Sequence, residues 1–483
     1  MRLHGFIKSG LLLSSGSAIG AICTFARNII ITRLISVEDY GIAATFGITM
    51  ALIQMATGLG VDRLIIQAVD GNEPKLQATA QAFNILRGIF LAIVLYAVAS
   101  PVAHLFKLPE VVWAFQWLAV LPLITGFVHM DSARFQRAMR FGPLAIIGSV
   151  PQVITLAVSA PLALYFGDYR VMLWIITIQA VTTVLLSFLL AERKFKLAMD
   201  KEYLHRIFTF GWPLMLNGLL MFGIFQADRG IVGIAYDMEN LGWFSAAFTL
   251  TLFPAIVLMS AAQNLMTPMI AKTQTDPELL GKSAVASTKA FFILGTLMAV
   301  GLALGGPSLS VVLFGEKYLG GAYIIPWLAL MQGIRMIKAG PTTVAVACGK
   351  TKLPLYSNML RSTALPLALF SVWNDWGVIG IVLSGVFGEF LAAVFFIFLI
   401  RKVTGLHLAS LYGTMIISIA LMAAAMILSL YLVTGLSPVL EISGAVAFSL
   451  VALAVLLLFA ADLIAWVKEH GKTPQATSGS IEQ

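Results

Sequence analysis

The sequence predicts an all-α polytopic membrane protein with about fourteen transmembrane helices. Of its 483 residues, 59% are hydrophobic and only 11% are charged, and the mean hydropathy is +0.92. A soluble domain carries roughly 25% charged residues. Apolar runs of about 18 residues or more, which is the length that crosses a bilayer, recur along the whole chain. These runs do not alternate in segments of about ten residues, as the strands of a membrane β-barrel do.

The apolar runs define the predicted helices in chain order. They cover residues 9–33, 40–67, 78–104, 111–132, 143–166, 171–191, 206–227, 240–269, 285–314, 321–346, 353–373, 377–400, 407–433 and 440–466. With the N-terminus in the cytoplasm, most Lys and Arg residues fall in inner loops, as the positive-inside rule requires. The rule therefore predicts that both termini are cytoplasmic. It also explains the net charge of +8, so no nucleic-acid partner is expected.

Two stretches of the chain resemble each other and indicate an internal repeat. Residues 27–46 read RNIIITRLISVEDYGIAATF, and residues 228–248 read DRGIVGIAYDMENLGWFSAAF. Arg27 corresponds to Arg229 and Gly41 to Gly242, across a one-residue gap. A fainter match relates MRFGPLAIIGSVPQ to TKLPLYSNMLRSTALP later in the chain. The competing interpretation is that apolar helices resemble one another by composition alone.

The repeat predicts how the chain is organised. We expect an N-lobe of six helices over residues 1–197, a C-lobe of six helices over 198–403, two further helices over 404–467, and a disordered cytoplasmic tail over 468–483. Because six is an even number, both copies insert in the same orientation. Parallel repeats of this kind occur in secondary transporters, which place the substrate between the halves.

Basic side chains inside the predicted spans mark a candidate substrate site. A charge at mid-bilayer costs at least about 2.5–3.5 kcal/mol, so its retention suggests a cavity. The candidates for a cationic substrate-binding cavity are Arg27, Arg229, Arg87, Arg335, Arg361 and Lys338. Cations outnumber acids in the spans, which favours an anionic substrate. The alternative is that those near helix ends extend to the lipid headgroups.

Two acidic residues are candidates for ion coupling. Glu389 lies near the middle of its predicted helix and cannot extend far, so it needs a buried partner or carries a proton. Asp228 adjoins Arg229 and is the second candidate. Coupling to H⁺, coupling to Na⁺ and the use of the membrane potential alone all stay open.

The sequence lacks the motifs of common enzyme classes. CGKTK at 348–352 resembles part of a P-loop, but the required glycine five residues before Gly349 is Val344. The sequence has no HExxH, GxSxG or CxxC motif, and Cys23 and Cys348 lie far apart in apolar segments. The predicted outer loops are too short for a catalytic domain. We therefore predict a transporter without cofactor or metal, and not an enzyme.

Three stretches carry a resemblance to a known family. They are RNIIITRLISVEDYGIAA, ARFQRAMRFGPLA at 133–145 and GWPLMLNGLLMFGIFQADRGIVG at 211–233. Together with the length and the fourteen-span layout, they resemble the polysaccharide transporters of the multidrug/oligosaccharidyl-lipid/polysaccharide exporter superfamily. These are the Wzx-type flippases for lipid-linked oligosaccharides.

The resemblance implies two six-helix lobes in a V around a cationic central cavity, with Arg27 and Arg229 on or beside its lining helices. It implies that the chain translocates an undecaprenyl-diphosphate-linked oligosaccharide repeat unit from the cytoplasmic to the periplasmic leaflet of the bacterial inner membrane. The product would serve O-antigen, capsule or exopolysaccharide synthesis. The expected partners are this lipid-linked substrate, membrane lipids, a polysaccharide polymerase and a chain-length regulator.

Three alternatives stay open at this point. A lipid II flippase shares the fourteen helices, and the charge of the cavity does not separate it from the first interpretation. A drug/cation antiporter of the same superfamily would favour acidic residues in the cavity. A membrane polysaccharide polymerase or glycosyltransferase is disfavoured by the short outer loops.

Overall fold

The computed structural model describes residues 2–350, 352–404, 409–432, 437–460 and 463, and all regular structure in these ranges is helical. The predicted all-α class is therefore confirmed. The contacts divide the helices into two compact units. Unit 1 comprises the residues up to Thr249 together with Leu313–Gly321, and unit 2 comprises Leu250–Val312 and the described residues from Ala322 onward. The predicted boundary between the two lobes at residue 198 is inferred from the internal repeat of the sequence. A division by contacts does not test that repeat, so the boundary stays a prediction.

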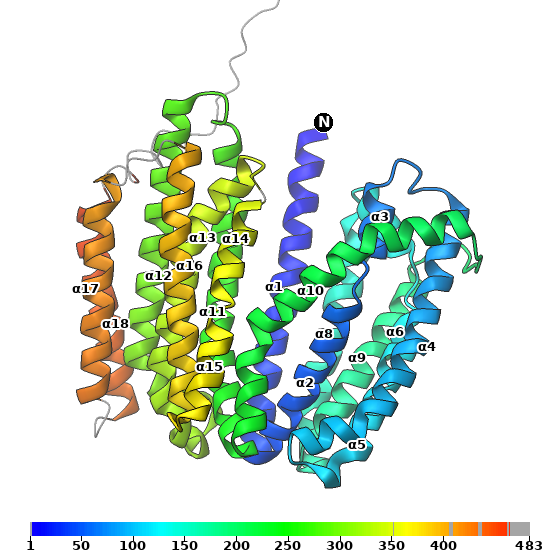
Figure 1. The fold of residues 1–483 in the computed structure, drawn as a ribbon, viewed down its shortest axis with the longest axis horizontal. Helices are drawn as coiled ribbons and strands as arrows, with labels where there is room; N and C mark the ends of the chain where they lie inside the picture. Colours follow the sequence, from blue (N-terminus) through cyan, green and yellow to red (C-terminus); the bar gives the residue numbers. More distant parts are fainter. Residues whose placement is uncertain (1, 351, 405–408, 433–436, 461–462, 464–483) are drawn as a thin grey trace, which may run out of the picture. The chain divides into compact units, whose positions relative to one another are not determined.

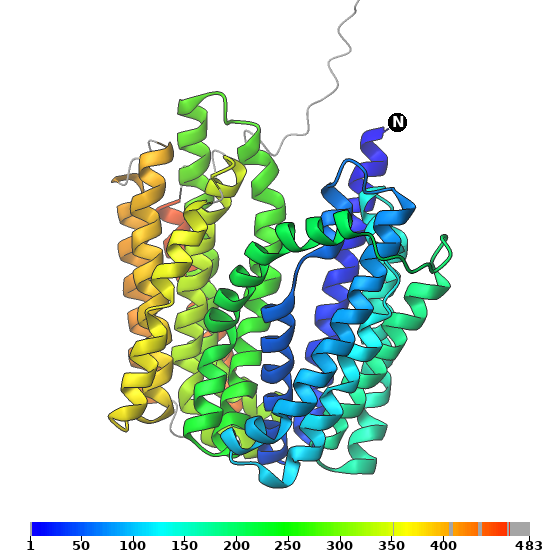
Figure 2. The ribbon, with the colours of Figure 1, turned by 45° about the vertical axis from the view of Figure 1, so that its right-hand side comes forward.

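Unit 1 is a helical bundle. Its elements are α1 (Arg2–Leu34), α2 (Val37–Thr57), α3 (Val61–Gln67), α4 (Pro74–Leu105), the 3-10 helix η1 (Pro109–Val111), α5 (Val112–Leu118), α6 (Val120–Gly126), α7 (Asp131–Arg137), α8 (Phe141–Phe166), α9 (Arg170–Leu189) and α10 (Lys201–Ala235). Helix α6 packs against α4 and α9, and α9 packs in turn against α8 (Figures 1 and 2). Helix α1 packs along α8, and α10 packs along α2.

Unit 2 contains most of two long helices and all the later ones. Its elements are α11 (Met238–Ala271), α12 (Pro277–Phe314), η2 (Glu316–Ile324), α13 (Ile325–Ala347), α14 (Lys352–Arg361), α15 (Ala364–Trp373), α16 (Gly377–Thr404), α17 (Ala409–Leu432) and α18 (Pro438–Leu458). The start of α11 up to Thr249, the last two residues of α12 and the start of η2 belong to unit 1. Helix α16 packs against α13, α14 and α15.

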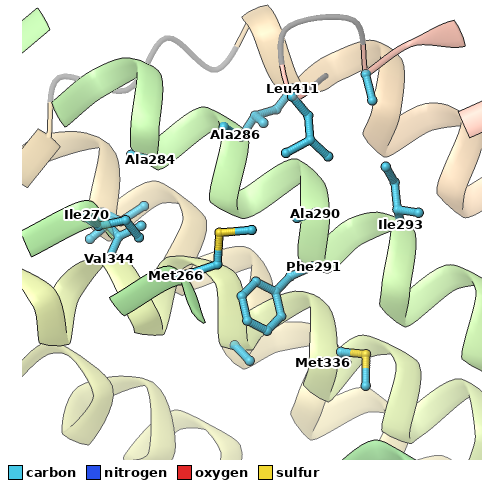
Figure 3. Close-up of a cluster of buried hydrophobic side chains, with 14 of the residues drawn as sticks. Met266, Ile270, Ala284, Ala286, Ala290, Phe291, Ile293, Met336, Val344 and Leu411 are labelled. Atoms are coloured by element: carbon cyan, nitrogen blue, oxygen red, sulfur yellow. The ribbon is translucent and has the colours of Figure 1, made fainter. Parts of the chain in front are cut away.

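A large apolar cluster forms the core of unit 2 (Figure 3). Phe291 on α12 is fully buried, and Met336 on α13 and Ile270 on α11 contribute to the same cluster. Ala284 and Ala290 add small side chains on the face of α12 that enters the cluster. Small residues let membrane helices approach closely, which is how such helices associate without a hydrophobic driving force between them.

Eleven helices of the described part are long and apolar enough to cross a membrane, judged by length and composition. Each of the fourteen predicted spans coincides with a helical segment, but three of them fall outside this set of eleven. They are α1, α13 and the broken pair α14–α15. The predicted count of fourteen is therefore not confirmed, and the predicted tail at 468–483 lies outside the described residues.

Three segments predicted as single helices are interrupted. The segment predicted over 111–132 divides into η1, α5, α6 and the start of α7. The segment predicted over 40–67 divides into α2 and α3 at Gly60, whose φ of +58° lies in the left-handed region that glycine enters readily. The segment predicted over 353–373 divides into α14 and α15. Pro366 has no N–H to donate to the carbonyl of Ser362, four residues earlier, so the helix breaks at Ser362 and Thr363 and restarts as α15.

The repeated stretches begin two helices in the same way. The hydroxyl of Ser36 accepts the backbone N–H of Asp39 at 3.0 Å and caps the start of α2. The carboxylate of Asp237 accepts the backbone N–H of Asn240 at 2.7 Å immediately before α11. Both residues satisfy a backbone donor that the first turn of a helix leaves without a partner. The similarity of the two stretches therefore extends to their local structure.

The starts of α2 and α11 also contact each other reciprocally within unit 1. The backbone of Gly41 lies against the carbonyl of Met238, the first residue of α11. The backbone of Gly242 lies against the carbonyl of Val37, the first residue of α2. A Cβ atom at either glycine would overlap the facing carbonyl.

Two lysines form a second reciprocal contact in unit 1. Lys107, which follows α4, donates to the carbonyl of Ala235 at the end of α10 over 3.3 Å. Lys317, which follows α12, donates to the carbonyl of Arg33 over 3.2 Å and to that of Ile35, at the end of α1. Each ammonium group thus meets carbonyls that a helix end leaves free, where the helix dipole is negative.

Candidate functional site

Three cationic side chains converge on one carboxylate in the interior of unit 2. Glu389 on α16 has no solvent exposure. Its carboxylate accepts from Arg335 Nε at 2.6 Å and from Lys338 Nζ at 3.0 Å. Arg361 Nε lies 2.7 Å from the oxygen that Arg335 also contacts. Three positive charges less one negative charge leave the cluster with a formal charge of +2.

The local sequence explains how this cluster assembles. Arg335 and Lys338 are three residues apart on α13, so they lie on one face of the helix, and α13 packs along α16. Arg361 is the last residue of α14, immediately before the helix break. An ion in a low-dielectric interior is stable only with close partners, so Glu389 ties these helices together.

The structure brings together four of the predicted site residues from three separate spans. Glu389 has the buried partners that its position in the predicted helix required. Its role as an ion carrier stays a prediction. Protonation of this carboxylate would leave three cations facing one another, which a low-dielectric interior disfavours.

Gln332 extends the polar face of α13 by one turn, and the sequence reasoning missed it. Its side chain is fully buried, yet neither its amide nitrogen nor its amide oxygen has a hydrogen-bond partner among the described residues. Buried polar groups are normally paired, so such a group calls for an explanation. The spacing that found Arg335 and Lys338 would also have found Gln332 if neutral side chains had been considered.

Arg27 lies in the interior of unit 1 among neutral acceptors. Its side chain is 8% exposed. One terminal nitrogen donates to Thr155 Oγ1 at 2.9 Å, to Gln152 Oε1 at 3.3 Å and to Gln179 Oε1 at 3.4 Å. These acceptors lie on α8 and α9. None is a carboxylate, so the hydrogen bonds orient the guanidinium group without neutralising its charge.

Arg229 on α10 lies over an aromatic ring. The carbon of its guanidinium group is 4.4 Å from the centroid of Phe248, a cation–π contact. Tyr40 is buried and interacts electrostatically with both Arg27 and Arg229. The side chains of Tyr40 and Thr249 form a hydrogen bond. The two arginines of the repeated stretches thus lie within electrostatic reach of one buried tyrosine.

Arg87 lines a cavity of about 320 Å³ within unit 1, among α2, α4 and α6. One terminal nitrogen donates to the carbonyl of Thr57, the last residue of α2, at 3.1 Å. Its Nε is buried and has no hydrogen-bond partner in the described ranges. Gln54 and Asn84 add further polar groups to the cavity wall. The cavity therefore suits a small polar or anionic group.

The predicted site residues divide between the two units. Arg27, Arg87, Asp228 and Arg229 belong to unit 1, and the cluster around Glu389 belongs to unit 2. That all six cations line one cavity stays a prediction. No group of three or more His, Cys, Asp or Glu side chains in the described part is arranged to hold a metal ion.

Sequence reasoning also missed an ionic network around Asp131, at the start of α7. Asp131 is fully buried and accepts from Arg134 Nε at 2.6 Å and from the backbone N–H groups of Glu192 at 2.7 Å and Arg193 at 3.0 Å. Burial by itself raises the pKa of this carboxyl, but these donors outweigh it and hold the pKa well below its usual range. Glu192 in turn pairs with Arg134 and Arg140. Arg134 and Arg140, which lie in a segment predicted to be a cytoplasmic loop, therefore link α7 to the segment after α9.

The comparison with protein families matches residues 30–322 to the family described as polysaccharide biosynthesis protein. This match covers more than half of the chain.

Several curated proteins are similar to the chain. The amylovoran biosynthesis protein AmsL of Erwinia amylovora is 24% identical over 62% of this chain and 78% of its own length. The teichuronic acid biosynthesis protein TuaB of Bacillus subtilis strain 168 is 23% identical, over 63% of each chain. The succinoglycan biosynthesis transport protein ExoT of Rhizobium meliloti strain 1021 is 24% identical over 63% of this chain and 62% of its own. The chain thus spans less than two thirds of the length of the last two.

Solved structures share the fold. The lipid II flippase MurJ in an inward closed conformation superimposes with a TM-score of 0.74, at 13% identity, over 95% of this chain and 99% of its own. An inward-facing multidrug resistance MATE family transporter of the MOP superfamily gives a TM-score of 0.68, at 14% identity, over 80% and 94%. At these identities the likeness shows the fold alone.

The succinoglycan relative is named as a transport protein, in agreement with the prediction that the chain is not an enzyme. The family match and the shared fold also agree with the resemblance seen in the sequence. The chain belongs to the polysaccharide biosynthesis protein family.

Proposed function

We propose that the chain is a flippase that moves an undecaprenyl-diphosphate-linked oligosaccharide repeat unit from the cytoplasmic to the periplasmic leaflet. The observation that carries this proposal is the excess of buried positive charge in apolar helices. In unit 2 three cations share Glu389, and in unit 1 Arg27 meets neutral acceptors. A cation that its surroundings do not neutralise attracts an anion, and a lipid diphosphate is such an anion.

The names of the relatives support a polysaccharide precursor as the substrate. They are named for amylovoran, teichuronic acid and succinoglycan, three different polymers. The polymer made with this chain would be an O-antigen, a capsule or an exopolysaccharide. A polysaccharide polymerase and a chain-length regulator would then use the translocated unit.

Transport would proceed by alternating access between two six-helix lobes, residues 1–197 and 198–403. Arg27 and Arg229 would hold the diphosphate, since the guanidinium group offers paired donors to phosphate oxygens. The headgroup must cross about 30 Å of hydrocarbon, while the polyprenyl tail stays in lipid. An inside-negative potential favours outward movement of an anion by about 2.3 kcal/mol per charge per 100 mV. Glu389 or Asp228 would carry a coupling ion.

Lipid II is the second candidate substrate. The fold similarity to the lipid II flippase covers 95% of this chain, and lipid II is also a polyprenyl diphosphate. The buried cations fit either diphosphate. They fit a cationic drug poorly, because a cationic substrate needs acidic side chains around it.

Reconstituted transport tests the proposal. Purified protein is placed in liposomes that contain either the lipid-linked oligosaccharide or lipid II, and a membrane-impermeant glycan-modifying enzyme reports which sugars reach the outer leaflet. We expect protein-dependent exposure of the oligosaccharide, and slower exposure with Arg27→Ala and Arg229→Ala together. Exposure of lipid II alone would select the second candidate, and no protein-dependent exposure in either arm would contradict both.

The proposed orientation places both termini in the cytoplasm of a bacterial cell, at its inner membrane. Met199 is 61% exposed in the segment between α9 and α10, on the predicted inner side. In a background without Cys23 and Cys348, Met199→Cys should react with an impermeant maleimide only after the inner membrane is permeabilised. Glu110→Cys, on the predicted outer side, is the control and should react in cells whose inner membrane is intact. The reverse pattern would contradict the orientation.

A further inference from the structure

A second cavity in unit 1 has no part in the transport site described above. Its volume is about 280 Å³, and it lies between the start of α4 and the segment that joins α9 to α10. Its polar lining consists of Gln77, Gln81, His129, Arg193, Lys194 and Lys196. A water molecule occupies about 30 Å³ in the liquid, so the cavity has room for a phosphate group and several waters.

The cations around this cavity have no carboxylate in its lining. Lys194 and Lys196 are exposed, and neither makes an ion pair or a hydrogen bond to another side chain in the described ranges. Among the acidic groups of this region, Asp131 and Glu192 are engaged by Arg134 and Arg140, and Asp200 pairs with Lys75. The two ammonium groups are therefore available to an external anion.

Arg193 gives this side of the cavity a fixed shape. One terminal nitrogen donates to the carbonyl of Asn72 and to Gln77 Oε1, both at 2.9 Å. Its backbone N–H donates to Asp131. A binding wall held by hydrogen bonds on both the side chain and the backbone is preorganised, which lowers the cost of binding.

His129 supplies a buried ring nitrogen at the cavity, and the backbone of Arg193 interacts with the same ring. The residue is 2% exposed, and its ring contacts those of Phe188 and Phe195, which also contact each other. Its Nδ1 accepts the backbone N–H of Asp131 at 3.1 Å. Burial lowers the pKa of His129 and so favours the neutral ring. Because Nδ1 accepts a hydrogen bond, the hydrogen of the neutral ring is on Nε2. That Nε2 is buried and has no hydrogen-bond partner among the described residues.

The N-terminus of α4 adds to the positive potential. Pro74 is the first residue of this 32-residue helix and lines the cavity, and the first turn carries no acidic side chain. Unpaired N–H groups and the helix dipole make such a terminus attractive to phosphate. This feature acts together with the lysines, the arginine and the buried histidine around one cavity.

We propose that this cavity binds a phosphate group, carried by an anionic lipid headgroup or by a soluble phosphoester, on the face predicted to be cytoplasmic. The proposal does not depend on the transported substrate. Leu197 and Met199, in the same segment as the lysines, are 58% and 61% exposed. Basic side chains interleaved with exposed apolar ones are typical of a segment at the membrane interface, which favours the lipid as the carrier.

The test compares two pairs of exposed lysines on the full-length protein. The pocket variant is Lys194→Gln with Lys196→Gln. The matched control is Lys272→Gln with Lys350→Gln, which removes the same charge on the same predicted face, outside the cavity. One arm counts phosphatidylglycerol molecules retained by the detergent-purified protein in native mass spectrometry. The other arm measures binding of inorganic pyrophosphate by calorimetry.

We expect the pocket variant to weaken binding by about tenfold or more in at least one arm, because two charge-assisted contacts are lost. The control should stay within about twofold, since distant exposed charges are screened by salt. Lys194→Arg with Lys196→Arg should keep binding. An effect confined to phosphatidylglycerol identifies a lipid site, and one confined to pyrophosphate identifies a soluble ligand. Equal binding by the pocket and control variants in both arms would overturn the proposal.

Discussion

Gly41 and Gly242 pack the first turns of α2 and α11 against each other, each glycine facing the first residue of the other helix. The facing groups are backbone carbonyls, those of Met238 and Val37. The internal repeat of the sequence is therefore also a contact in the structure. Any residue larger than glycine at these two positions would force the helix starts apart.

Gly41→Ala should destabilise the protein, because the added methyl group meets a backbone carbonyl that cannot move aside. Overpacking of this kind costs about 1–3 kcal/mol. Gly47, on the same helix, is exposed and has open space around it, so Gly47→Ala is the control. That control should be neutral or stabilising, since alanine favours a helix over glycine by about 0.8–1 kcal/mol. Thermal unfolding of the purified protein compares the two, and similar shifts would contradict the close approach.

The Asp131 network predicts a pH dependence of stability. Donors from Arg134 and the backbone hold the pKa of Asp131 below its unfolded value of about 3.9. A carboxylate of this kind stabilises the fold at pH values above its unfolded pKa, and the contribution is lost as the pH falls through its folded pKa.

Asp131→Asn should therefore lower the unfolding free energy at neutral pH by about 1.5–3 kcal/mol, the contribution of hydrogen bonds to a charged group. The difference from the unchanged protein should be constant between about pH 5 and 8 and should shrink below about pH 4. Asp168→Asn, which removes a partly exposed ion pair with Arg170, is the control and should change little. A difference that grows on acidification would show that Asp131 does not act as a paired carboxylate.

The positions of the helices could be predicted because hydropathy is a property of the local sequence. The run over 143–166 corresponds to α8 (Phe141–Phe166), and the run over 377–400 corresponds to α16 (Gly377–Thr404). The helix breaks could not be read from hydropathy, since Gly60 and the turn at Ser362 and Thr363, one turn before Pro366, interrupt the helices without interrupting the apolar composition. A rule for glycine conformation and proline hydrogen bonding would have been needed at these two places.

The candidate site was predicted in part. Arg335 and Lys338 could be placed on one helical face from their spacing, and Glu389 could be expected to need a partner. That Arg361 would join them depends on how α14 packs against α16, which no local pattern contains. The surroundings of Arg27 were missed because Gln152 and Gln179 are neutral, and a search for charges passes over them.

Glu389→Gln should strongly destabilise unit 2, because three cations lose their shared counter-charge. Removing one partner of a buried ion pair typically lowers the free energy of unfolding by about 3–5 kcal/mol. Adding Lys338→Met should restore part of the loss by removing one of the stranded charges. Thermal unfolding of the single and double variants measures both effects. If the double variant is no more stable than Glu389→Gln alone, the cluster does not depend on charge balance.

The same variant tests ion coupling. In proteoliposomes, a Glu389→Gln protein that stays folded should lose any dependence of transport on a pH gradient if Glu389 carries the proton. An unchanged response to the gradient would leave Glu389 as a structural partner of α13 and α14. Transport is normalised to the folded fraction, so that the loss of stability is not mistaken for a loss of coupling.

The arginines of the repeat should not tolerate replacement by lysine. Arg27 reaches three acceptors with one terminal nitrogen, which leaves the other side of its guanidinium group for a ligand. Arg229 lies over Phe248, and both arginines interact with Tyr40. Lysine keeps the charge but loses the planar pair of donors, so Arg27→Lys and Arg229→Lys should each lower transport by about tenfold or more, and alanine should lower it further. Arg63→Lys, exposed on α3, is the control and should keep full transport.

The readout is surface polysaccharide restored in a flippase-deficient host, with membrane expression measured in parallel. Full restoration by the Arg27→Ala, Arg229→Ala double variant at normal expression would show that these arginines only position their own helices.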